Sequence, residues 1–319
     1  MRIYNKLDRC LLMASFSAII FSSLFTGDLA RAEEMPLADL HFHPDSSSSP
    51  GKMLKEQDQS GVKWAGLGVK GANADSRGTE ADFSAAFGNR LILFGGQSEL
   101  NLIFKKGGLK AAESATTPEF KKLMARLEED LKSKRIKGIG EIFVNNKTSS
   151  QTGWMKRRMK TDAASMRAIF ALAAKYKAFV GIHMEWKSDS VKQLETVLKA
   201  SPGMKLLINH CGSENKASQM RPFLKKYPNA YCELSFRYPP VMPKKAKRRI
   251  IFTESSFDKD WKSLIEDFPD RFMIGTDAHN SKQYTDSIKT VRKGLLKKLT
   301  PKTAKMVAYG NAQKLFDLK

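Results

Sequence analysis

The histidines are the residues whose type and spacing point to chemistry. The chain has five of them, at His41, His43, His183, His210 and His279. The first two stand one residue apart in "LADLHFHPD", and Asp277 precedes the last one in "GTDAH" with the same spacing. Neutral imidazole and carboxylate are the usual nitrogen and oxygen ligands of zinc and similar divalent ions. These residue types therefore suggest a metal site.

Eight apolar runs of strand length are the elements that must position these residues, and amphipathic segments of helical length separate them. The runs cover residues 35–43, 62–70, 90–96, 136–144, 178–185, 205–212, 230–236 and 271–279. The clearest helix is 117–134, where Thr117 is placed as an N-cap and Pro118 stands at the first helical position. Helices are also predicted at 161–177, 189–200 and 257–268. Alternating strands and helices imply a parallel sheet, and eight units predict a (β/α)8 TIM barrel. An open doubly wound sheet is the alternative, but no glycine-rich phosphate loop follows the first run.

The carboxyl ends of barrel strands meet at one rim, and all five histidines fall at such ends. Side chains two residues apart on a strand share a face, which places His41 with His43 and Asp277 with His279. The same rule places Glu141, late in the fourth run, on the face of Ile139. A single histidine or aspartate at a strand end is usually structural. The gathering of all five at one rim predicts a metal site, where a carboxylate can accept a proton from an activated water.

The order of these motifs resembles the amidohydrolase superfamily of barrel hydrolases, in particular its amidohydrolase-related and TatD-like branches. The matching segments are "DLHFHPD", "GIGEIF", "VGIHME", "LINHCG" and "IGTDAH". The ending "YGNAQKLFDLK" resembles the sequence that closes such barrels, and "MLKEQDQSGVKWAGLGV" resembles their first helix and second strand. The resemblance covers essentially the whole chain after residue 32.

The resemblance implies a role for each position. His41, His43, His183 and Asp277 would be metal ligands, and Asp277 would also take the proton from the attacking water. His210 would be a ligand of a second ion or a catalytic residue that orients water. Glu141 would bridge two ions, as in TatD-like members, or would be a core carboxylate paired with a lysine such as Lys137 or Lys70. We expect one or two divalent ions, with two favoured and zinc ahead of manganese or iron.

The expected activity is metal-dependent hydrolysis of an amide, ester, lactone or phosphoester bond in a small anionic substrate. A decarboxylase on the same barrel is the first alternative, since such relatives use one metal and no strand-four bridge. "TDAH" and "DLHFHPDSSSS" also resemble PHP-type phosphoesterases, but the further Asp-His of those enzymes is missing after the second run. A non-catalytic metal-binding protein is the last alternative. Arg237, just past the seventh run, is either a substrate-binding group or a surface arginine.

The first 32 residues are predicted to be a secretory signal peptide. Basic residues precede an apolar run at 11–25, and the small-residue site Ala30-Arg31-Ala32 follows it. The run is 15 residues long, whereas a bilayer span needs roughly 20, so no stable membrane anchor is expected. Cleavage after Ala32 would leave one domain at 33–319, in the periplasm or outside the cell.

The mature chain would still be strongly basic. The formal charge of +22 falls to +20, because the leader holds four basic and two acidic residues. One tight basic run lies at 243–249, but no nucleic-acid motif accompanies it, so no nucleic-acid partner is expected. The charge is that of a solvated surface or of one that attracts anions. The oligomeric state is left open.

Two cysteines remain after the leader, Cys211 and Cys232. They fall in neighbouring predicted strands, and either a disulfide or two buried thiols would suit them. Two loops, at 45–52 and 145–160, are expected on the rim that carries the histidines.

Overall fold

The computed structural model describes residues 35–44, 49–68, 76–146, 158–241 and 250–319. The predicted signal peptide, the basic run at 243–249, Lys70 and most of the two rim loops lie outside these residues. The first loop, expected at 45–52, ends earlier than expected, because a helix begins at Pro50 with Ser49 as its N-cap.

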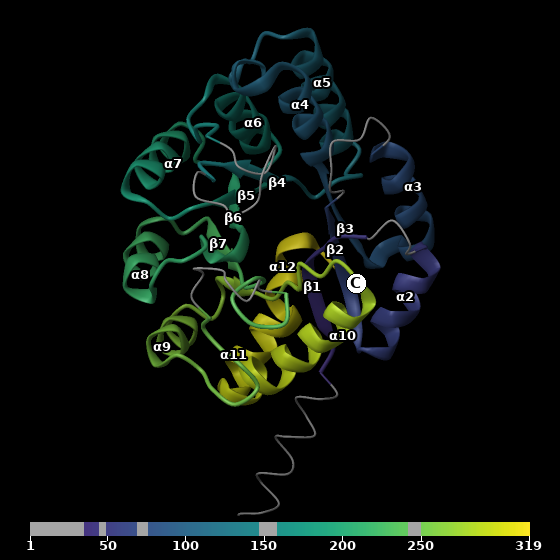
Figure 1. Ribbon diagram of the computed structural model, residues 1–319, viewed down its shortest axis with the longest axis vertical. Coiled ribbons are helices and arrows are strands. Elements are labelled where there is room, and N and C mark those ends of the chain that lie inside the picture. Colours follow the sequence, from purple (N-terminus) through teal and green to yellow (C-terminus); the bar gives the residue numbers. More distant parts are fainter. Residues whose placement is uncertain (1–34, 45–48, 69–75, 147–157, 242–249) are drawn as a thin grey trace, which may run out of the picture.

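Eight parallel strands form one sheet in the order of the sequence, which confirms the predicted TIM barrel (Figure 1). They are β1 (Leu37–Phe42), β2 (Val62–Gly68), β3 (Leu91–Gly96), β4 (Gly138–Val144), β5 (Phe179–Met184), β6 (Lys205–Ile208), β7 (Ala230–Glu233) and β8 (Phe272–Met273). Parallel bridges from Asp39 to Ile274 and from Phe42 to Ala278 bring β1 beside the chain that follows β8. The sheet therefore closes on itself.

Helices surround the strands in the ring that Figure 1 shows. The α-helices are α2 (Pro50–Gln59), α3 (Ser76–Phe87), α4 (Gln97–Glu113), α5 (Pro118–Lys132), α6 (Ala164–Lys175), α7 (Ser188–Ala200), α8 (Ala217–Lys226), α9 (Lys259–Asp267), α10 (Ser281–Thr290), α11 (Pro301–Lys305) and α12 (Asn311–Phe316). Short 3-10 turns are η1 (Gly88–Arg90), η3 (Asn209–Cys211) and η5 (Leu296–Lys298), and π turns are η4 (Val291–Leu295) and η6 (Met306–Gly310).

Helix α5 shows how closely local signals set the boundaries. The Thr117 hydroxyl accepts the backbone N–H of Phe120 at 3.3 Å, and Pro118 opens the helix, as predicted. Its buried positions include Phe120, Leu123 and Leu127, at the spacing that faces a helix toward a core. The predicted helices at 161–177, 189–200 and 257–268 correspond to α6, α7 and α9.

The core has two layers. The larger lies between the strands and the surrounding helices, and the smaller fills the barrel. In the smaller layer, Phe316 of α12 packs on Phe179, which begins β5, and on Phe94 of β3. The C-terminal helix therefore closes the barrel at the end where the strands start. The opposite end, where the strands finish, is left for polar side chains.

Among the described residues, no helix is both long enough and apolar enough to cross a membrane.

Candidate metal site

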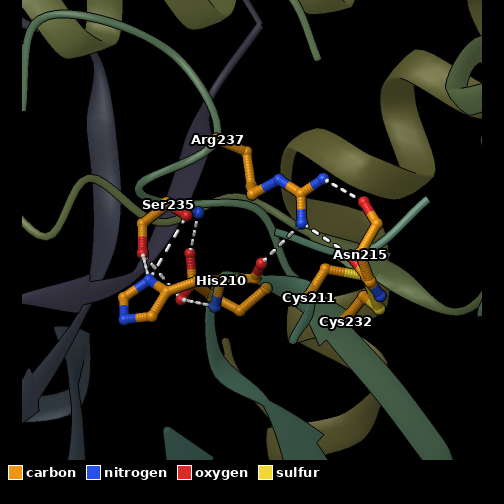
Figure 2. Close-up of a disulfide and its surroundings, with 7 residues drawn as sticks. His210, Cys211, Asn215, Cys232, Ser235 and Arg237 are labelled. Carbon is orange, nitrogen blue, oxygen red and sulfur yellow. Dashed lines mark hydrogen bonds between the residues drawn. A yellow bond between two sulfur atoms is a disulfide. The ribbon is translucent and has the colours of Figure 1, made fainter. Parts of the chain in front are cut away.

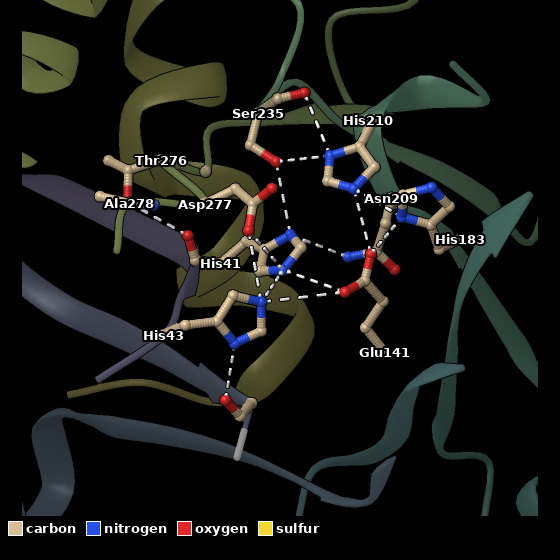
Figure 3. Close-up of polar contacts among 12 residues, drawn as sticks. His41, His43, Glu141, His183, Asn209, His210, Ser235, Thr276, Asp277 and Ala278 are labelled. Atoms are coloured by element: carbon tan, nitrogen blue, oxygen red, sulfur yellow. Dashed lines mark hydrogen bonds and ion pairs between the residues drawn. The ribbon is translucent and has the colours of Figure 1, made fainter. Parts of the chain in front are cut away.

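The structure gathers the predicted ligands at the carboxyl ends of the strands (Figure 3). They are His41 and His43 from β1 and its end, Glu141 from β4, His183 from β5, His210 after β6 and Asp277 after β8. Each is buried, with at most 6% of its surface exposed. Buried charges need partners, and here each group faces the others. Six residues from five strands thus form one cluster, as the sequence predicted.

The first half of the cluster joins His41, His43, Asp277 and one oxygen of Glu141. The Nε2 atoms of the two histidines lie 3.1 Å apart. Glu141 Oε2 lies 3.5 Å and 3.8 Å from them, and Asp277 Oδ1 lies 3.7 Å and 3.3 Å from them. An ion with four ligands at about 2.0–2.2 Å in a tetrahedron separates them by roughly 3.3–3.6 Å. His41, His43 and Glu141 form a group that could hold a divalent ion, and Asp277 borders both histidines of this group.

The second half joins the other oxygen of Glu141 with His183 and His210. Glu141 Oε1 lies 2.9 Å from His183 Nδ1 and 3.0 Å from His210 Nε2. The two histidine nitrogens are 3.0 Å apart. One carboxylate therefore presents one oxygen to each pair of histidines. Among the described residues its contacts are these imidazoles and the side-chain amide of Gln97, which donates to Oε2 at 3.4 Å, and not Lys137. Lys70, the other lysine of the alternative interpretation, lies outside the described residues.

Glu141 reaches this position through an irregularity in β4. The register between β4 and β5 shifts between Ile139 and Ile142. A shift of this kind turns a side chain to the other face of a strand. Ile139 packs outward, next to Leu127 of α5 at Gly96, while Glu141 points into the site. The expectation that these two residues share a face is wrong, because the strand does not alternate regularly there.

Gly140 makes this irregularity possible. Its φ is +138°, and a Cβ there would lie 2.5 Å from the carbonyl oxygen of Gly181 on β5. Only glycine allows so close an approach of the two strands without strain.

Contacts outside the cluster orient the first two histidines. His43 Nδ1 lies 2.9 Å from the carbonyl oxygen of Gly68, and His41 Nδ1 lies 3.0 Å from Glu233 Oε2. Such contacts hold a ligand ring in place and leave its other nitrogen for a metal. Glu233 is completely buried at the end of β7, and sequence analysis missed it. The sequence feature that could have indicated Glu233 is its acidic side chain within the apolar run at 230–236.

Asp39 is a second buried carboxylate that sequence analysis missed. It accepts the backbone N–H of His41 at 3.1 Å, the backbone N–H of Thr276 at 2.9 Å and the Thr276 hydroxyl at 2.8 Å. Burial raises the pKa of Asp39 to about 7, against the lowering effect of these hydrogen bonds. Through these hydrogen bonds, Asp39 connects β1 to Thr276, the residue before Asp277, at the place where the barrel closes.

The cluster is strongly coupled electrostatically. Burial lowers the pKa of His41, but the charges of Glu141 and Asp277 outweigh it and hold that pKa well above its usual range. Burial likewise raises the pKa of Glu141, but His41, together with hydrogen bonds from His183 and His210, holds it well below its usual range. The pKa of Asp277 is lowered in the same way by His41 and His43, despite its burial. The carboxylates are therefore ionised and suited to hold a cation.

A disulfide joins Cys211 to Cys232 behind the site (Figure 2). Sequence analysis left this pairing open, and the structure decides it. Each cysteine is the chain neighbour of a site residue, since Cys211 follows His210 and Cys232 precedes Glu233. His210, Cys211 and Gly212 have φ values of 56°, 46° and 75°, so the chain turns sharply where the disulfide holds it.

Arg237 and His279 lie near the cluster in different settings. Arg237 is completely buried, donates to the side chain of Asn215 at 2.7 Å and stacks on Trp261 at 4.6 Å. That burial excludes the surface-arginine interpretation. The contacts of the guanidinium with Asn215 and Trp261 are within the protein and argue against a substrate-binding role. His279 is half-buried and stacks on His43, with ring centroids 5.6 Å apart. It therefore lies beside Asp277 against the same histidine.

Comparison with known proteins identifies the family. The family model described as Amidohydrolase matches residues 38–318, and the chain belongs to this family. No curated protein matches the sequence.

Several solved structures share the fold at low identity. A 2,6-dihydroxybenzoate decarboxylase from Rhizobium is 12% identical, with 89% of this chain and 99% of that chain covered at a TM-score of 0.52. An amidohydrolase from Burkholderia multivorans with bound zinc is 11% identical, with 89% and 100% covered at a TM-score of 0.53. An uncharacterised TIM-barrel protein from Bordetella bronchiseptica is 14% identical, with 94% and 92% covered at a TM-score of 0.53. At such low identity, these similarities show a shared fold and nothing about activity.

Proposed function

We propose that this member of the amidohydrolase family is a metal-dependent hydrolase with a two-ion site. The observation that carries the proposal is the position of Glu141. Its two oxygens face two different pairs of histidines, with His41 and His43 at one and His183 and His210 at the other. A carboxylate placed in this way is suited to bridge two ions.

The donor set favours a divalent transition ion. His41, His43, Asp277 and Glu141 would hold the first ion, and His183, His210 and Glu141 the second. Zinc is our first choice because imidazole and carboxylate suit it, and the similar Burkholderia barrel contains zinc. Manganese and iron use the same ligands. Such an ion supplies Lewis-acid chemistry and lowers the pKa of water toward neutrality.

The protein residues then handle the proton and the geometry. Asp277 Oδ1 borders the first half at 3.3 Å from His43 Nε2, where its carboxylate can accept the proton of the attacking water. His210 Nε2 points at Glu141 and His183, which favours a ligand over a free acid–base group. Substrates of this class are amides, esters, lactones or phosphoesters. The basic charge of the chain, +22 in full and +20 without residues 1–32, supports an anionic one.

The test is metal content, measured by elemental analysis of the purified protein beside Glu141→Ala. We expect two equivalents in the wild type and one or fewer in the variant, because each ion would lose a ligand. Glu80→Ala is the matched control, since Glu80 is also a buried glutamate but pairs with Arg126 and Arg135. Two equivalents should remain in that control. One equivalent that is insensitive to Glu141→Ala would contradict the two-ion site.

A decarboxylase is the second candidate, favoured by the fold shared with 2,6-dihydroxybenzoate decarboxylase. The two activities differ in product, because a decarboxylase releases CO2 whereas a hydrolase consumes water. Assays of the metal-loaded protein on hydroxybenzoates and on a panel of lactones, anionic amides and phosphoesters would separate them. The PHP-type alternative is not favoured, because the amidohydrolase model matches the chain from residue 38 to residue 318.

We also propose that the protein is exported to the periplasm or secreted. The leader-like sequence of residues 1–32 and the Cys211–Cys232 disulfide support this, since disulfides persist in oxidising compartments. N-terminal sequencing of the protein from cell fractions tests it, with Glu33 expected as the first residue. A retained leader in a cytoplasmic fraction would contradict the proposal.

A further inference from the structure

Glu233 contacts both halves of the site from behind. We propose that it is a positioning residue that fixes the proton tautomers of His41 and His210, so that both present Nε2 to the metal ions. The inference rests on the proposed two-ion site. It gives Glu233 a positioning role outside the six proposed ligands, although Glu233 also lies with His41 and His210 in a group whose atoms could hold an ion.

The contacts of Glu233 show that both its oxygens accept hydrogen bonds. Oε1 accepts the backbone N–H of Ser235, and Oε2 accepts the Ser235 hydroxyl at 2.9 Å. The backbone N–H of His210 also points at Oε2, at 3.4 Å. Backbone N–H groups can only donate. The side chain, which is completely buried, therefore acts as a carboxylate with acceptors at both ends.

The first tautomer follows directly. His41 Nδ1 lies 3.0 Å from Glu233 Oε2, and a carboxylate can only accept, so Nδ1 carries the proton. In a neutral imidazole the other nitrogen then holds the lone pair. That nitrogen is Nε2, which lies 3.1 Å from His43 Nε2 in the first half of the site. The amide nitrogen of Asn209, a donor, also lies 3.2 Å from His41 Nδ1. The amide rotated by 180° would present its otherwise unpartnered oxygen to this nitrogen and accept from it, as the tautomer requires.

The second tautomer follows through Ser235. Because its hydroxyl donates to Glu233, its oxygen is left to accept, and His210 Nδ1 lies 2.8 Å from that oxygen. His210 Nδ1 therefore carries a proton, and the lone pair is on Nε2. That Nε2 lies 3.0 Å from Glu141 Oε1 in the second half of the site. The Glu233 carboxylate thus fixes the tautomer of one histidine in each half of the site.

The surroundings hold Glu233 in place. The Cys211–Cys232 disulfide, which Figure 2 shows, links the residue after His210 to the residue before Glu233 and so ties these two stretches of backbone together covalently. On the other side, a Cβ at Gly275 would overlap the carboxylate. The Tyr238 hydroxyl donates to the carbonyl oxygen of Gly275 at 2.7 Å and fixes that backbone.

The primary test is Glu233→Gln, with zinc affinity measured by competition against a chelator. The amide has one donor end, which must face either the Ser235 N–H or His41 Nδ1. Either choice breaks the arrangement, and we expect the Kd for zinc to rise about 10–100-fold. Glu233→Asp keeps the carboxylate and should recover part of the affinity. The matched control is Glu80→Gln, which alters a buried glutamate of α3 and should leave the Kd for zinc unchanged.

Two further measurements separate positioning from general damage. Ser235→Ala removes the hydroxyl that links Glu233 to His210 and keeps the 3.0 Å contact of Glu233 with His41 Nδ1, although the hydroxyl oxygen also lies 3.3 Å from that nitrogen. We therefore expect the zinc ion at His210 to bind more weakly and the zinc ion at His41 to be affected less. In the zinc-loaded wild type, the proton that His41 Nδ1 shares with a carboxylate should give a downfield NMR resonance. That resonance should be absent in Glu233→Gln and present in Glu80→Gln.

The outcomes distinguish this proposal from the proposed function. If the wild type binds no zinc, both fail. If the wild type and Glu233→Gln bind two zinc ions with the same Kd, the two-ion site stands and the positioning role is wrong. If Glu233→Gln does not fold, Ser235→Ala is the deciding variant. Unchanged binding of both ions by that variant would overturn the proposal that Glu233 acts on His210 through Ser235.

Discussion

Asp277 is the residue on which the proposed chemistry depends most directly. Its carboxylate borders His43 at 3.3 Å and is the group that we expect to accept the proton of water. Asp277→Asn keeps the size of the side chain but removes the basic oxygen. We expect turnover to fall at least 10²-fold, the typical contribution of a positioned general base, with little change in the circular dichroism spectrum. Turnover that survives the change would contradict the role of Asp277.

The raised pKa of His41 predicts how zinc binding depends on pH. Burial lowers that pKa, but Glu141 and Asp277 raise it well above its usual range, so the metal-free protein holds a proton that zinc must displace. Zinc affinity should therefore rise with pH and continue to rise above pH about 6.5, where an ordinary histidine has largely titrated. Chelator competition across pH measures this. An affinity that levels off below that pH would show that His41 does not compete in this way.

At the scale of elements, Gly140 is the point where β4 departs from regular alternation. A Cβ there would lie 2.5 Å from Gly181 O, and φ is +138°, so Gly140→Ala must move β4 away from β5. We expect a loss of more than about 1 kcal/mol in the free energy of unfolding and weaker binding of both ions, because Glu141 follows directly. Denaturant titration and elemental analysis measure the two effects.

Gly51→Ala is the control for this substitution. Gly51 lies in α2, and a Cβ there would meet nothing within 4 Å. Alanine is the better helix former, so stability should be unchanged or higher by up to about 1 kcal/mol. Equal effects of the two substitutions would contradict the account of Gly140.

The Cys211–Cys232 disulfide connects the ends of β6 and β7 across 21 residues of sequence. A loop of this length predicts a loss of about 3 kcal/mol in the free energy of unfolding for the double variant Cys211→Ser, Cys232→Ser. We also expect weaker zinc binding, because His210 and Glu233 are the neighbours of these cysteines. Chemical denaturation and a zinc titration would show both. An unchanged zinc Kd beside lowered stability would confine the disulfide to a role in folding.

At the scale of the whole molecule, the site lies at one end of the barrel, and the smaller core layer, with Phe316 of α12, closes the other end. Apolar packing inside the barrel and beneath the helices does not include the metal ligands. Removal of metal by a chelator should therefore leave the protein folded. It should also lower the melting temperature, because an ion at 1,000 times its Kd adds about 4 kcal/mol.

For a chain of this size, that difference corresponds to a shift on the order of 8 °C. Scanning calorimetry with and without chelator, followed by re-addition of zinc, measures it. A melting temperature that chelator does not change would contradict a bound ion in the native protein.

The sequence alone determined the barrel and most of the cluster. Strand runs and amphipathic helices are local patterns, which is why α5 begins at the predicted residue and the eight strands appear in order. The placement of His41, His183 and His210 at one rim follows from the same patterns, since all parallel strands of a barrel end on one side.

Only the tertiary structure decided what surrounds those ligands. Glu233 meets His41 across 192 positions of sequence, and Asp39 meets Thr276 across 237. Whether Arg237 is buried and whether Cys211 pairs with Cys232 depend in the same way on neighbouring strands. The inward turn of Glu141 depends on the register between β4 and β5. Such contacts arise from barrel closure and strand register, which join distant segments, and no local periodicity of the sequence encodes them.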